Sequence, residues 1–215
     1  FDAAGASRCL IEEHQQPWLN LDSGLRFLKS GEILLTAERT GFRHAYLYDG
    51  EGGLVRQVTS GDWAVTSVVH VDEDRRLLYF TATKASVLER HLYVVSFDGG
   101  DITRLTIEPG WHGAVMSRDG AHFLDVHSSL DHAPAITLRD ADGALQAVLF
   151  SNDGVDAETL GLTPPGLVEL PAADGTMLYG ALYRPDGFEP GVRYPVVVSV
   201  YGGPHAQRVA DEWSL

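Results

Sequence analysis

Short runs of apolar and β-branched residues, separated by polar turn signals, fill the first two-thirds of the chain. The clearest runs are Ile33–Thr36, Ala45–Tyr48, Leu77–Thr81, Leu92–Val95 and Ala135–Leu138. Runs of this length and composition are typical of strands. Asp-Gly pairs favour hairpin turns, because glycine tolerates a positive φ, and such pairs begin at Asp49, Asp98, Asp119 and Asp142. No segment before residue 150 keeps a helical period, so the pattern predicts a mainly β structure.

The strand pattern repeats along the chain. The segment Arg43–Tyr46 recurs 47 residues later as Arg90–Tyr93, and Thr59 recurs as Thr106 at the same distance. Three tryptophans follow a similar spacing, namely Trp18, Trp63 and Trp111. A period in the forties with about four strands in each unit is typical of propeller blades and favours them over a β-sandwich. About three units fit before residue 150, fewer than the roughly four to eight blades of a closed ring, so a partial propeller is predicted.

The pattern changes after Phe150. The segment Thr163–Gly166 cannot continue a strand or a helix, because it holds two prolines and a glycine. Beyond it, two alternating runs flank an Asp174-Gly175 turn and predict one more hairpin. The run Val196–Val200 is unbroken, as in a strand buried on both faces of an α/β sheet. We therefore predict propeller blades over residues 1–150, a linker over 151–166 and the start of an α/β domain over 167–215.

Composition and charge exclude several classes of protein. The 16 basic and 30 acidic residues give a net charge of −14, which argues against a nucleic-acid partner that needs a basic surface. The single cysteine, Cys9, excludes an internal disulfide framework and leaves the compartment, cytoplasm or periplasm, open. The run Val196–Val200 is far too short to cross a bilayer, so no membrane segment is expected.

Histidines and repeated residues are the candidates for other chemistry. His112, His122, His127 and His132 recur at intervals of five or ten residues, which match neither a strand face nor a helix face. We therefore expect no metal site and no cofactor. Because a repeated feature usually serves the repeat, we expect Arg43-His44 and Arg90-His91 to fix hairpins. Trp63 and Trp111 are expected to pack within blades for the same reason.

Several motifs, in one order from about Ala37 to the end of the chain, resemble a known family. They are Ser60–Trp63, Tyr79–Thr83, Leu88–Tyr93, Pro109–His112, Ser128–Asp131 and Tyr194–Pro204. They resemble the bacterial branch of the dipeptidyl peptidase IV subfamily, within the prolyl oligopeptidase family of serine peptidases. The resemblance implies an eight-bladed propeller over an α/β-hydrolase domain. This chain then corresponds to the last blades, followed by the first strands of the hydrolase domain.

The resemblance also implies an activity and one catalytic residue. The parent protein is expected to release N-terminal dipeptides, with proline or alanine in the second position, from peptide substrates, and to form a homodimer. Tyr201 matches the family's oxyanion-hole tyrosine, in the segment Tyr201–Pro204. The chain holds no Gly-x-Ser-x-Gly nucleophile elbow, so the catalytic serine, aspartate and histidine are expected to be missing and the chain alone to be inactive. Glu12-Glu13 are interpreted as solvated carboxylates rather than as the family's amino-terminus anchor.

Two alternatives remain at this stage. One is a non-catalytic propeller used as a binding scaffold, although a scaffold has no need of a buried valine run and a Tyr-Gly-Gly-Pro loop. The other is a sister activity of the same family, either a tripeptidyl-peptidase or an acylaminoacyl-peptidase. The family's glutamate anchor distinguishes these activities, and no segment of this chain is assigned to it.

Overall fold

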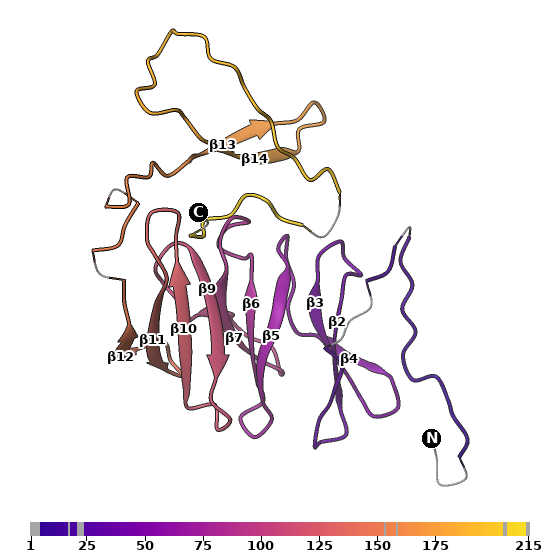
Figure 1. Ribbon diagram of the computed structural model, residues 1–215. Coiled ribbons are helices and arrows are strands. Elements are labelled where there is room, and N and C mark those ends of the chain that lie inside the picture. The colour runs from indigo at the N-terminus through magenta and orange to yellow at the C-terminus, as the bar shows by residue number, and fades with distance from the viewer. Residues whose placement is uncertain are drawn as a thin grey trace.

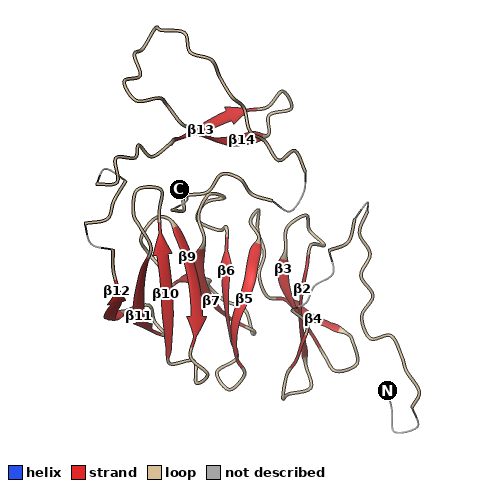
Figure 2. Ribbon diagram, in the orientation of Figure 1, coloured by secondary structure: helices blue, strands red, loops and turns tan. Residues whose placement is uncertain are grey.

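The computed structural model describes residues 5–16, 18–20, 24–152, 154–157, 159–203 and 206–213. Within these ranges the regular structure consists of strands alone (Figure 2), and no helix long and apolar enough to span a membrane is found there. Three four-stranded antiparallel sheets follow one another along the chain, and their strands keep the order of the sequence. Figure 1 shows the three sheets side by side, with a separate two-stranded hairpin beyond one end of them.

The sheets contain all the strand runs predicted before residue 150. The first sheet holds β1 (Arg26–Phe27), β2 (Ile33–Ala37), β3 (His44–Tyr48) and β4 (Leu54–Gln57). The second holds β5 (Val65–Asp72), β6 (Leu77–Ala82), β7 (His91–Ser96) and β8 (Thr103–Arg104). The third holds β9 (Trp111–Met116), β10 (His122–Ser128), β11 (Ala135–Asp140) and β12 (Leu145–Phe150). Three successive four-stranded units before residue 151 are consistent with three propeller blades.

The faces between neighbouring sheets are apolar. Leu47 of the first sheet and Phe80 of the second belong to one buried cluster, in which Trp63 stacks on Phe80 with ring centroids 6.0 Å apart. Leu92 of the second sheet and Phe123 of the third belong to another. Neighbouring sheets thus bury the sides that face each other, as stacked propeller blades do.

The 47-residue repeat places the same histidine–threonine contact in the first and second sheets. The Nδ1 atom of His44 lies 3.1 Å from Thr59 Oγ1, and His91 Nδ1 lies 3.1 Å from Thr106 Oγ1. Each threonine oxygen also accepts the backbone N–H of the residue after the histidine, at 2.9 and 3.0 Å respectively. All four side chains are buried. The predicted role of these histidines in fixing the repeat is confirmed.

A second repeated contact joins each sheet to the next. The Val65 N–H donates to the Arg43 carbonyl oxygen at 2.8 Å, and the His112 N–H donates to the Arg90 carbonyl oxygen at 2.9 Å. The two donors, Val65 and His112, are 47 residues apart, and so are the two acceptors. Trp63 packs in a buried cluster, which agrees with the packing role predicted for it, and Trp111 is partly buried beneath the Arg90 guanidinium. In contrast, Trp18 is 68% exposed and lies outside every strand. The spacing of Trp18 is therefore not part of the structural repeat.

The hairpin predicted around Asp174-Gly175 is present. It consists of β13 (Gly166–Pro171) and β14 (Met177–Leu182), and Gly175 in its turn has a φ of +87°. In contrast, the predicted buried strand at Val196–Val200 is wrong for this structure, because the segment is irregular and Val197 is 94% exposed. A strand forms only beside a hydrogen-bonded neighbour, and within the described residues none lies beside this run. An α/β-hydrolase sheet is therefore not evident, and the boundaries at 150 and 166 stay predictions.

Candidate functional site

A cavity of about 600 Å³ lies between the second sheet and the segment that contains Tyr201. The loop between β6 and β7 contributes Thr83, Val87 and Leu88 to its wall, and β14 contributes Met177 to Tyr179. The third part of the wall is formed by residues 199–203 and 206–209. In Figure 1 this chain segment crosses the space between the sheets and the β13–β14 hairpin. Residues about 120 positions apart in the sequence thus share one cavity.

Tyr201 lies in the wall of this cavity with its side chain 54% exposed. Gly202 follows it with a φ of +66°, which favours glycine. A Cβ atom on Gly203 would lie 3.1 Å from Tyr201 Cε1, so the missing side chain leaves room for the tyrosine ring. The two glycines therefore leave space beside the ring, which lines the cavity. The following Pro204 lies outside the described residues.

The acidic pair Glu12-Glu13 is engaged in local contacts. The carboxylate of Glu13 forms an ion pair with the guanidinium of Arg39, with one contact of 2.9 Å between Arg39 Nε and Glu13 Oε2. Glu12 Oε1 lies 2.9 Å from His14 Nε2. Glu12 is solvated as expected, with its side chain 73% exposed, but the expectation is wrong for Glu13, whose side chain is only 19% exposed in its ion pair with Arg39. These partners give no reason to assign an amino-terminus anchor to the pair.

Four imidazole rings form a continuous column that crosses from the second sheet into the third. Ring centroids are 5.0 Å apart between His91 and His112, 4.4 Å between His112 and His127, and 5.8 Å between His127 and His132. His112 and His127 are directly opposed in the β9–β10 register, which explains the closest contact. Among the described residues no group of three or more His, Cys, Asp or Glu side chains has a metal-binding arrangement. His122, the remaining histidine of the four with regular spacing in the sequence, lies exposed at the other end of β10.

A buried charged network supports this column. His112 Nδ1 lies 2.8 Å from Asp125 Oδ1, and both side chains are fully buried. Asp125 Oδ2 lies 3.2 Å from Arg139 Nε, within ion-pair distance although outside hydrogen-bond geometry. Arg139 also donates to Glu108 Oε1 at 3.0 Å, and the Glu108 backbone oxygen accepts from His112 Nε2 at 2.8 Å. Burial alone would raise the pKa of Glu108, but backbone hydrogen bonds and Arg139 outweigh it and hold the pKa at about 2.

Acidification is expected to destabilise the protein through this column. Burial is the main reason that the pKa values of His91 and His127 lie below the ordinary value, and neighbouring His112 lowers both further. The histidines of the unfolded chain, with a pKa of about 6.5, then bind protons at pH values at which those of the folded chain stay neutral. The free energy of unfolding therefore has its full value above about pH 7 and decreases as the pH falls through about 6.5.

The measurement is the melting temperature between about pH 7.5 and about pH 5.5, where carboxylates remain largely ionised. The variant His127→Gln is expected to flatten the fall in melting temperature, because it removes one of the two groups. His122→Gln, at an exposed position on the same strand, is the matched control and should keep the slope of the unchanged protein. A melting temperature that stays constant over this range would contradict the prediction.

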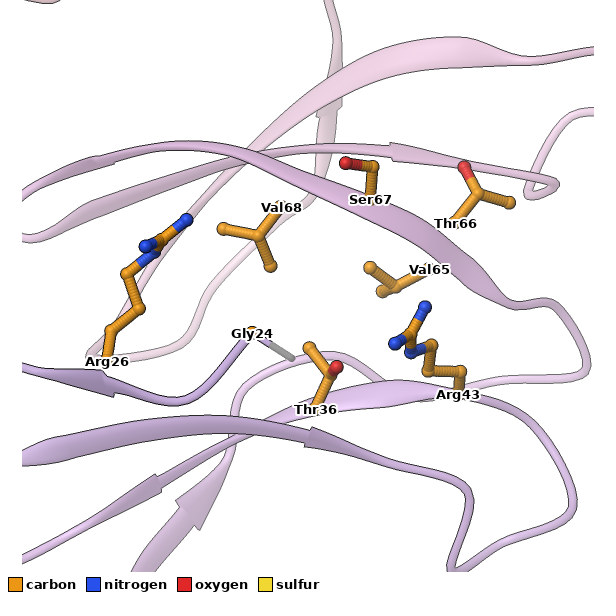
Figure 3. Close-up of a pocket in the computed structure, with 8 residues that line it drawn as sticks. All are labelled: Gly24, Arg26, Thr36, Arg43, Val65, Thr66, Ser67 and Val68. Atoms are coloured by element: carbon orange, nitrogen blue, oxygen red, sulfur yellow. The ribbon is translucent and has the colours of Figure 1, made fainter. Parts of the chain in front are cut away.

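A smaller pocket of about 250 Å³ lies between the first and second sheets. Figure 3 shows Arg26 toward one end and Arg43 toward the other, with Thr36 of β2 on the same side as Arg43 and residues Val65–Val68 of β5 across from them. It shares no lining residue with the cavity at Tyr201. The candidate catalytic site is therefore the larger cavity.

Sequence reasoning missed the residues that tertiary contacts bring together. Glu108, Asp125 and Arg139 belong to no motif, and their spacing gives no signal of a shared network. Arg90 was expected to fix a hairpin, but its side chain reaches Gln207, 117 residues away. The histidine spacing was judged only as a possible metal site and gave no signal that the rings stack, and His91 comes from the neighbouring sheet.

Comparisons with known proteins give a consistent picture. Residues 1–134 match the family described as the dipeptidyl peptidase IV (DPP IV) N-terminal region. The chain is 31% identical over 244 residues to human dipeptidyl peptidase 8, covering 95% of this chain and 27% of that protein. It is 31% identical over 190 residues to a probable dipeptidyl peptidase 4 of Emericella nidulans, covering 82% and 23% respectively.

The fold also matches a solved structure. The crystal structure of Porphyromonas gingivalis dipeptidyl peptidase 4 aligns with a TM-score of 0.87 and 25% identity, over 96% of this chain and 30% of that chain. This chain therefore spans about a quarter of the length of the curated relatives that it matches.

Proposed function

The chain belongs to the family of the dipeptidyl peptidase IV N-terminal region, and we propose that it is part of a longer serine exopeptidase that removes N-terminal dipeptides. The proposed substrates are peptides with a free amino terminus and proline or alanine in the second position. In this proposal the chain supplies the last blades of a propeller, the first part of a hydrolase domain and one catalytic residue, Tyr201.

The observation that carries the proposal is the position of Tyr201. Its ring lies in a cavity of about 600 Å³, walled on one side by the β6–β7 loop and on the other by residues 199–203. A phenol in such a place can donate its O–H to the oxygen that becomes negative when the scissile carbonyl turns tetrahedral. The second donor, the nucleophilic serine and its partners are assigned to the remainder of the parent protein, because no nucleophile elbow occurs in this sequence.

The proposal is tested with chromogenic amides on the full-length protein. A dipeptidyl-proline amide with a free amino terminus should be cleaved, whereas its N-acetylated counterpart and a tripeptidyl amide should be poor substrates. The 215-residue chain alone should show no turnover above background, because it lacks the nucleophile. Cleavage of the acetylated substrate would indicate an acylaminoacyl-peptidase, and release of tripeptides a tripeptidyl-peptidase. A full-length protein that cleaves none of the three substrates would support the binding scaffold instead.

A further inference from the structure

The segment 206–213, here called the anchor segment, is bound to loops of the second and third sheets. The Gln207 side chain donates from Nε2 to the Val87 carbonyl oxygen at 2.8 Å. The Asp211 N–H donates to the Leu88 carbonyl oxygen at 2.9 Å, and Asp211 Oδ1 accepts the Leu130 N–H at 2.9 Å. These contacts join positions 81 to 123 residues apart, so they are properties of the tertiary fold.

Arg90 organises the loop side of this contact. Its guanidinium lies over the Trp111 ring, 4.5 Å from the centroid. Its NH1 group donates to the carbonyl oxygens of Val87 at 3.1 Å and Glu89 at 2.7 Å, and its NH2 group donates to Gln207 Oε1. Arg90 is partly buried, and this burial lowers the pKa of its guanidinium from the ordinary value. Because contacts with Trp111, Val87 and Glu89 fix the guanidinium, it holds its fourth partner, the Gln207 side chain, in a defined place.

The anchor segment and Tyr201 line the same cavity. Gln207 follows Tyr201 by six residues, and both belong to the cavity wall together with Val87 and Leu88. The intervening Gly202 and Gly203 have no side chains to fix the backbone, so the direction of the tyrosine ring depends on what holds the chain beyond them. The contacts of Gln207 are the nearest such constraint in sequence among the hydrogen bonds to the sheets.

We propose that Arg90 and Gln207 are positioning residues, which bind the anchor segment to the β6–β7 loop and thereby fix the direction of the Tyr201 phenol in the cavity. The inference rests on the function proposed above, in which Tyr201 is the oxyanion donor. It gives the propeller side of the protein a second role, because the second sheet then both walls the cavity and holds part of the catalytic apparatus in place.

The test is a double-mutant cycle on the full-length protein with a dipeptidyl-proline amide. Gln207→Ala is expected to lower kcat by about 10-fold to 100-fold with KM little changed, because a misplaced donor weakens mainly the transition state. In a Tyr201→Phe background the same substitution should change kcat by less than about 2-fold, because the donor that it positions is already absent. Gln207→Glu, which keeps an oxygen acceptor for Arg90, should restore part of kcat.

Gln146→Ala is the matched control. Gln146 is exposed on β12 of the third sheet and binds Asp140, away from the cavity. It should leave kcat and KM unchanged in both backgrounds. Equal losses from Gln207→Ala with and without the Tyr201 hydroxyl would overturn the inference, since they would show an effect that does not pass through Tyr201.

Hydrogen exchange separates failure of this inference from failure of the proposed function. Gln207→Ala should accelerate amide exchange at Asp211 and Leu130, whose N–H groups are hydrogen-bonded across this contact, whereas Gln146→Ala should not. If Tyr201→Phe leaves kcat unchanged but Gln207→Ala accelerates exchange at both amides, the oxyanion role is wrong and the anchor contact stands. If Gln207→Ala leaves exchange at both amides unchanged, the positioning role is wrong, whatever Tyr201 does.

Discussion

Replacing Asp125 with asparagine is expected to lower the free energy of unfolding by about 3–5 kcal/mol, the usual cost of removing one partner from a buried ion pair. Asp125 is completely buried, 2.8 Å from His112 Nδ1 and 3.2 Å from Arg139 Nε. The amide keeps the shape of the side chain but not its charge, so the Arg139 guanidinium, 10% exposed, loses its buried counter-charge. Denaturant unfolding, compared with the unchanged protein at about pH 7.5, measures the loss.

Two further variants separate charge from packing. Asp101→Asn, at an exposed position, is the matched control and should leave the midpoint of unfolding almost unchanged. Asp125→Asn combined with Arg139→Met should recover part of the loss, because neither residue of the former ion pair then carries a charge. If Asp125→Asn costs no more than Asp101→Asn, the network contributes nothing to stability, contrary to this prediction.

Replacing Tyr201 with phenylalanine in the full-length protein is expected to lower kcat by about 10²–10³, equivalent to about 2.7–4 kcal/mol of transition-state stabilisation by one oxyanion donor. The substitution removes one oxygen and keeps the ring, which packs beside Gly203. The melting temperature should therefore change little. KM should also change little, because the hydrogen bond is made better to the tetrahedral species than to the ground-state carbonyl.

Tyr183→Phe is the matched control for this experiment. Tyr183 is 66% exposed, follows β14 and does not line the cavity, so kcat and melting temperature should both stay the same. A purely structural role of Tyr201 predicts the opposite pattern, with near-normal kcat and a lower melting temperature. An unchanged kcat for Tyr201→Phe would remove the only catalytic residue assigned to this chain.

The local part of the fold could be predicted because its causes are local. Strand runs and Asp-Gly turns are decided by neighbouring residues. The 47-residue period of His44 and His91 indicated a repeated unit, and in the structure each of these histidines makes the same buried contact with a threonine. The same reasoning failed for Val196–Val200, which has the composition of a buried strand. An apolar run becomes a strand only where another strand offers hydrogen bonds, and composition does not reveal the neighbour.

The sequence by itself determined the mainly β class of the structure, the repeat and the hairpin at Asp174-Gly175. Only the tertiary structure decided which distant side chains meet: the imidazole column, the buried Asp125 network, and the contact of Arg90 with Gln207. The physical reason is that strand and turn preferences act over a few residues, whereas these contacts join different strands, sheets and loops. Their energies depend on burial and on hydrogen-bond geometry, which exist only once the sheets have packed together.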